Sequence, residues 1–141
     1  MDLASTLSDN QFIKMLENKS LHKSYFDHIG HLRLAWIYLN KYSLECSLGL
    51  ISSNIKLYAE NLGATDKFNQ TITTAIVLLV AKRINELAIK TWDEFIELNQ
   101  DIVNDCLAVI KQFYSHELLF SEKAKREFVF PDKCMNFSRE L

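Results

Sequence analysis

Thr71 to Ala88 reads T-I-T-T-A-I-V-L-L-V-A-K-R-I-N-E-L-A, and this stretch decides the fold class. Its first half is rich in β-branched residues and, on propensity alone, would suit a buried strand. The apolar pattern nevertheless continues through Ile84 and Leu87, a span well beyond the length of an ordinary strand. We therefore predict a helix. Because that helix is apolar on nearly all sides, we expect it to be central.

Composition extends this prediction to the whole chain. The sequence has 141 residues, of which 48% are hydrophobic, enough for a sizeable core in one domain. Three glycines and one proline are too few for a sheet-rich fold, which needs many tight turns. We predict an all-α, single-domain, bundle-like array of about six helices around the central helix. Residues 1–7 and 133–141 are expected to be peripheral.

Polar residues that precede apolar stripes mark the expected helix starts. They are Ser8, Asp27, Ser43, Thr71, Thr91, Asp101, Ser115 and Ser121. Asn69 and Gln70 are alternative caps for the central helix. Gly63 is expected to end the helix that opens at Ser43, because glycine readily adopts the left-handed conformation found after helices.

Charge and hydropathy exclude two classes of partner. The net charge is −2, and no basic stripe is present that would neutralise the phosphates of a nucleic acid. The most apolar window, residues 71–81, is about half of the ~20 residues that a transmembrane helix needs. We therefore expect neither nucleic-acid binding nor membrane insertion.

Cysteine usage and the first residues indicate the compartment. Cys46, Cys106 and Cys134 are odd in number and show no C-x-x-C spacing, so neither a disulfide framework nor a thiolate zinc site is expected. We expect inert, reduced thiols that pack against apolar residues. The first ten residues contain no basic segment followed by an apolar run, which argues against secretion. A cytoplasmic protein is predicted.

The segment from Asp27 to Leu39, D-H-I-G-H-L-R-L-A-W-I-Y-L, carries two histidines on an otherwise apolar helix. At helical spacing His28 and His31 share a face with Leu32, so both imidazoles are expected to point toward the core. Three interpretations remain open: structural histidines with hydrogen-bond partners, the lining of a small-molecule pocket, or metal ligands. Arg33 lies on another face, where a salt bridge is its expected role.

A metal site is the weakest of these interpretations. Imidazoles three residues apart can reach one ion, although a spacing of four is commoner on helices. Two ligands do not make a site, and His22 and His116 are the only other histidines. No metal and no cofactor is assigned from the sequence.

The start of the central helix is a second polar region. Thr71 and Thr74 lie where unpaired backbone N–H groups and the helix dipole favour an anion or a polar ligand group. Asn69 and Gln70, just before them, could add amide contacts. Ordinary helix capping is the alternative explanation.

Three segments resemble a group of small, largely uncharacterised bacterial helical proteins. That group shows F-x-H-x-x-H-[LV]-R-[LV]-A-W-x-Y-L, G-x-x-x-K-[FY]-H-E-T-[IL]-T, and Y-x-x-E-x-L-x-S before F-x-x-P-D. The corresponding segments here begin at Phe26 (F-D-H-I-G-H-L-R-L-A-W-I-Y-L), Gly63 (G-A-T-D-K-F-N-Q-T-I-T), Tyr114 (Y-S-H-E-L-L-F-S) and Phe128 (F-V-F-P-D).

The resemblance implies that the histidine helix meets the start of the central helix, forming a polar cluster around His28, His31 and Thr71. Asn69 and Gln70 stand where the group would have His and Glu. These differences remove a candidate metal ligand and a candidate acid or base. Whether the chain is an enzyme is therefore left open.

Two functions follow from these observations. The favoured hypothesis is a domain that binds a polar small molecule in a cleft formed by His28, His31, Asn69, Gln70, Thr71 and Thr74, because histidines on a buried stripe cost desolvation. The alternative is a non-catalytic interaction protein or homo-oligomeric subunit with structural histidines. Its candidate docking patch is Phe120, Phe128, Val129 and Phe130.

Overall fold

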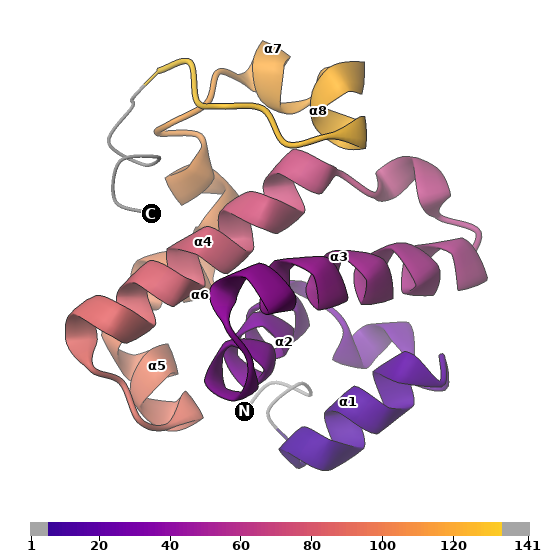
Figure 1. The fold of residues 1–141 in the computed structure, drawn as a ribbon, viewed down its shortest axis with the longest axis vertical. Helices are drawn as coiled ribbons and strands as arrows, with labels where there is room; N and C mark the ends of the chain where they lie inside the picture. Colours follow the sequence, from indigo (N-terminus) through magenta and orange to yellow (C-terminus); the bar gives the residue numbers. More distant parts are fainter. Residues whose placement is uncertain (1–5, 134–141) are drawn as a thin grey trace. The chain divides into compact units, whose positions relative to one another are not determined.

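The structure, a computed structural model, describes residues 6–133, and over that range its regular secondary structure is all helical (Figure 1). The predicted all-α class is confirmed. Contacts group the chain into two compact units, Met1–Phe68 and Asn69–Leu141. The single-domain organisation stays a prediction, and the peripheral segments expected at 1–7 and 133–141 lie largely outside the described residues.

The first unit is organised by its longest helix, α3. Its elements are α1 (Asp9–Glu17), the 3-10 turn η2 (Lys23–Tyr25), α2 (His28–Lys41), α3 (Leu44–Asn61) and the 3-10 turn η3 (Thr65–Lys67). Helix α3 packs against α1, α2 and η3. The predicted caps Ser8, Asp27 and Ser43 are confirmed, since each side chain accepts a backbone N–H of the first helical turn.

The end of α3 is a Schellman motif, as expected from Gly63. That residue has a φ of 70°, and its N–H donates to the carbonyl of Glu60 at 3.1 Å. The N–H of Ala64 donates to the carbonyl of Ala59 at 2.8 Å. This pair of bonds satisfies the last carbonyls of the helix and sends the chain directly into η3.

Arg33 ties α2 to α1. The residue is only 5% exposed, and its Nη2 donates at 2.8 Å both to Oδ1 of Asp9 and to the carbonyl of Leu7. The salt bridge predicted for Arg33 is therefore confirmed. The guanidinium also lies 5.8 Å from the ring centroid of Phe12, within reach of a cation–π attraction.

The second unit is built on α4 (Gln70–Leu87), which packs against α6 and α8 (Figure 1). Its other helices are α5 (Trp92–Leu98), α6 (Gln100–Ile110), α7 (His116–Leu119) and α8 (Glu122–Arg126). The predicted caps Thr91, Ser115 and Ser121 are confirmed. Helix α6 starts at Gln100, one residue before the expected Asp101.

The structure corrects the predicted start of α4. Thr71 was expected to open the helix, whereas the cap is the alternative residue Asn69, whose Oδ1 accepts the N–H of Ile72 at 2.9 Å. The predicted apolar character holds, because Ala75, Val77 and residues 78–80 are buried. Within the described range no helix is both long and apolar enough to cross a bilayer.

Gly30 allows α2 to begin close against η2. A Cβ at this position would lie 2.6 Å from the carbonyl oxygen of Tyr25 and 3.3 Å from Cδ1 of Phe26. A backbone oxygen cannot yield as a flexible side chain can. Glycine is therefore needed here for close approach, and the approach keeps Phe26 beside the first turn of α2.

We predict opposite effects for two glycine-to-alanine substitutions. Gly30→Ala should destabilise the protein by about 1–3 kcal/mol through overpacking. Gly49→Ala, in α3 with no atom within 4 Å of the new Cβ, should stabilise it by up to about 1 kcal/mol because alanine is the better helix former. Urea unfolding measures both. A Gly30→Ala variant as stable as Gly49→Ala would contradict the close approach.

Candidate functional site

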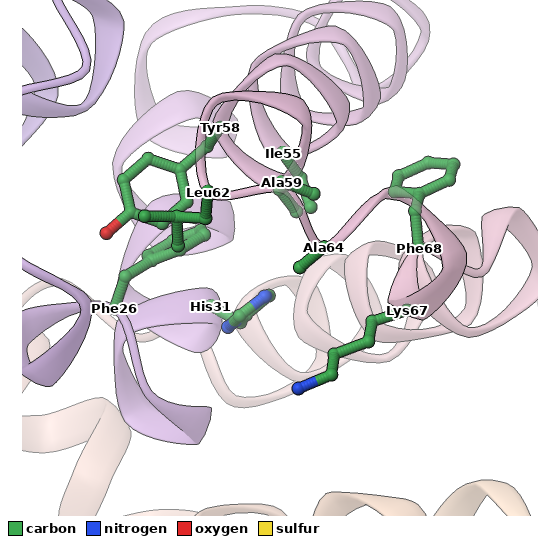
Figure 2. A pocket seen from close by; sticks show the side chains of 9 residues that line it. All are labelled: Phe26, His31, Ile55, Tyr58, Ala59, Leu62, Ala64, Lys67 and Phe68. Atoms are coloured by element: carbon green, nitrogen blue, oxygen red, sulfur yellow. The ribbon is translucent and has the colours of Figure 1, made fainter.

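The first unit contains a pocket of about 180 Å³ beside the start of α2. It is lined by Phe26, His31, Ile55, Tyr58, Ala59, Leu62, Ala64, Lys67 and Phe68 (Figure 2). Three of these residues come from α3, and four follow it in the chain. His31 and Lys67 are the residues of the lining whose side chains carry nitrogen, and most of the remaining surface is hydrocarbon.

His31 is held in one orientation by two contacts. Its Nδ1 lies 2.8 Å from the carbonyl oxygen of Asp27, and its ring stacks on Phe26 with centroids 4.1 Å apart. A carbonyl oxygen can only accept a hydrogen bond, so Nδ1 must carry the proton. In the neutral ring, Nε2 then has a lone pair and acts as an acceptor.

Burial favours this neutral ring. Desolvation of the half-buried ring lowers the pKa of His31 below 6.5, the backbone hydrogen bond to Asp27 opposes this shift, and the proximity of His28 adds to it. At neutral pH the imidazole is therefore uncharged. No described residue donates a hydrogen bond to Nε2.

Tyr58 contributes a ring to the pocket, but its hydroxyl is already used. The hydroxyl donates to the carbonyl of Leu21 at 2.6 Å, and burial raises the pKa of Tyr58. The ring meets Phe26 edge to face, with centroids 5.0 Å apart. Phe26 is thus fixed between His31 and Tyr58, and this side of the pocket is aromatic.

His28 does not line the pocket. It is the first residue of α2 and is exposed, so the expectation that both imidazoles face the core is wrong for His28. The face of a helix is covered only where a neighbour packs against it. On α2 burial begins at Gly30, which η2 covers, and His28 precedes that contact.

The other histidines have local roles. Nδ1 of His22 accepts the N–H of Ser24 at 3.2 Å and caps η2. His116 lies against Phe120, with ring centroids 4.7 Å apart. Within residues 6–133, no group of three or more His, Cys, Asp or Glu side chains is placed to hold a metal ion.

The predicted site residues at the start of α4 lie in the second unit and make hydrogen bonds inside it. Asn69 is buried, caps α4 and donates through Nδ2 to the carbonyl of Leu119 at 2.9 Å. Gln70 donates through Nε2 to Oγ1 of Thr74 at 3.0 Å. These bonds give the amides a structural role in addition to any contact with a ligand.

Thr71 holds the segment that follows α8. Its buried Oγ1 donates to the carbonyl of Glu127 at 2.9 Å and accepts the N–H of Val129 at 3.2 Å. Tyr114 supports the same segment by donating to the carbonyl of Val129 at 2.6 Å. The hydroxyl of Thr71 therefore has a donor and an acceptor within the unit. A cleft that joins the residues at the start of α4 to His28 and His31 stays a prediction.

The candidate docking patch is divided between interior and surface. Val129 is buried and Phe128 half-buried, whereas Phe120 and Phe130 are 38% and 67% exposed. Phe128 meets Phe130 edge to face at 5.6 Å between centroids. The four residues thus do not all pack inside, and their role in docking stays a prediction.

The cysteines differ in environment. Cys106 is buried, and burial raises the pKa of its thiol to about 12, which makes it the inert packing residue that was expected. Cys46 is exposed, so the packing role predicted for it is wrong. It lies in the first turn of α3. Cys134 lies outside the described residues.

Comparisons of the chain with protein-family models, with curated proteins and with solved structures found no match. The resemblance to small bacterial helical proteins therefore stays a prediction.

Sequence reasoning identified His31 but missed the other walls of the pocket. Tyr58 lies on the apolar face of α3 and Leu62 is the C-cap of that helix, and the helical pattern assigns both residues simply to the core. Lys67 and Phe68 occur in the G-A-T-D-K-F segment, whose glycine turn was a usable signal that the chain folds back beside α3.

The lowered pKa of His31 predicts a pH dependence of stability. Below 6.5 the unfolded chain takes up a proton at this residue while the folded chain does not, so the free energy of unfolding falls as the pH drops from 6.5 to the pKa of folded His31. Above 6.5 this contribution is constant. In His31→Leu the decline over that window should be shallower, as measured by urea unfolding at a series of pH values. Equal slopes for both proteins would contradict the burial of a neutral ring.

Proposed function

We propose that the first unit binds a small, mostly apolar molecule that donates a hydrogen bond to Nε2 of His31. The observation that carries the proposal is the imidazole of His31, fixed by its bond to Asp27 and its stacking on Phe26 in the wall of an otherwise apolar pocket. A polar atom in such surroundings costs desolvation free energy unless it gains a partner. A ligand hydroxyl or amide N–H would be that partner.

The size of the pocket limits the ligand. A cavity of about 150 Å³ lined by apolar side chains can hold benzene. A pocket of about 180 Å³ therefore suits one six-membered ring or a branched chain of similar volume. Larger molecules would have to leave part of their surface in solvent.

The walls favour an aromatic or compact aliphatic group. Phe26 and Tyr58 present ring surfaces, and Ile55 and Leu62 add aliphatic surface. Burying apolar ligand area against these walls contributes about 25 cal/mol per Å². Binding strength would thus come from the apolar body, while His31 would select ligands that carry a donor.

This proposal narrows the hypothesis drawn from the sequence. It retains His31 and a small-molecule ligand, and it replaces a polar cleft by an apolar pocket with one polar wall. It requires no role for His28, Asn69, Gln70, Thr71 or Thr74.

The test compares benzyl alcohol with toluene, which has the same ring but no donor. Amide resonances of the pocket, followed by NMR during titration, should shift with benzyl alcohol and respond more weakly to toluene. His31→Leu should reduce the affinity for benzyl alcohol by about two- to ten-fold, the value of one hydrogen bond. His116→Leu, which changes a histidine of the second unit, should not alter it. Equal binding of both molecules, or none of benzyl alcohol, would reject the proposal.

A further inference from the structure

Lys67 is, with His31, one of the two nitrogen-bearing side chains of the pocket lining and the only charged side chain among those nine residues at neutral pH. It is the last residue of η3, which packs on α3. Its side chain is exposed, and it forms no ion pair with any residue in the described range. The ammonium thus remains available to an anion at this edge of the pocket.

Among the described residues no ion pair joins Lys67 to Asp66, its neighbour in the chain, or to Asp27. Asp27 and His28 are the titratable groups that act on His31. The carboxylate of Asp27 caps α2, where it accepts the N–H of Gly30 at 2.9 Å. Apolar walls lower the effective dielectric constant, which strengthens an ion pair formed beside them.

His31 and Lys67 lie on the same side of the pocket in Figure 2, and the apolar side chains of α3 lie on the other. From this arrangement we infer that the pocket takes a small apolar carboxylate with a hydroxyl beside the carboxyl group. The hydroxyl donates to Nε2 of His31, the carboxylate pairs with Lys67, and the apolar body fills the pocket. This inference rests on the proposed function and names the class of its ligand.

A carboxylate without the hydroxyl fits less well. Its oxygens and Nε2 of neutral His31 are all acceptors, so they repel one another. Protonation of His31 would relieve the repulsion, but the burial of the ring opposes protonation. A hydroxyl between the two groups satisfies the acceptor and leaves the carboxylate to Lys67.

The test uses three probes that share one ring: mandelate has both groups, benzyl alcohol only the hydroxyl, and phenylacetate only the carboxylate. We expect mandelate to bind most tightly. Lys67→Gln should weaken the binding of mandelate by about two- to five-fold, as for a partly exposed ion pair, and should affect the binding of benzyl alcohol less. Added salt should also weaken the binding of mandelate, because it screens the ion pair. Lys56→Gln, an exposed lysine of α3 outside the pocket, is the matched control and should change neither affinity.

The outcomes separate this inference from the proposed function. If benzyl alcohol binds through His31 but Lys67→Gln does not change the affinity for mandelate, the inferred ligand class, a hydroxy-carboxylate, is wrong and the proposed function stands. Phenylacetate binding as tightly as mandelate would also overturn the ligand class. If neither mandelate nor benzyl alcohol binds, both fail. Lys67 is exposed, so its substitution should leave folding intact, and circular dichroism checks this.

Discussion

The hydrogen bond from Nδ1 of His31 to the carbonyl of Asp27 is the interaction on which the account of the pocket depends. At 2.8 Å, with an acceptor that has no proton to give, it assigns the proton to Nδ1. The lone pair of Nε2 then follows from the chemistry of neutral imidazole. Without this bond either nitrogen could carry the proton, and it would not be defined whether Nε2 donates or accepts a hydrogen bond in the pocket.

Local features of the chain hold this bond in place. Asp27 caps α2 with its side chain while its carbonyl accepts from both the ring and the backbone N–H of His31. Gly30 permits the close approach that keeps Phe26 stacked on the imidazole. At the C-terminal end of α3, the turn at Gly63 brings Lys67 to the same pocket. Short-range backbone geometry thus places both polar groups.

The sequence predicted those features that local chemistry determines. Ser8, Asp27, Ser43 and Gly63 were recognised because capping needs only a few neighbouring residues. His28 was misplaced because periodicity identifies a face but does not say how far a neighbour covers it. The pocket could not be predicted, since its walls come from α2, α3 and the segment after α3, and helical periodicity assigns its apolar residues only to a generic core. For Thr71 the sequence indicates a helix cap or a ligand contact and cannot show its actual role, because its partners Glu127 and Val129 are more than fifty residues away in the chain.

The most direct test is to determine which ring nitrogen of His31 carries the proton. A long-range ¹H–¹⁵N correlation spectrum at neutral pH distinguishes the two neutral tautomers and the charged ring by their nitrogen shifts. The account predicts a neutral ring with the proton on Nδ1 and an unprotonated Nε2. A proton on Nε2 alone, or a charged imidazolium at neutral pH, would contradict it.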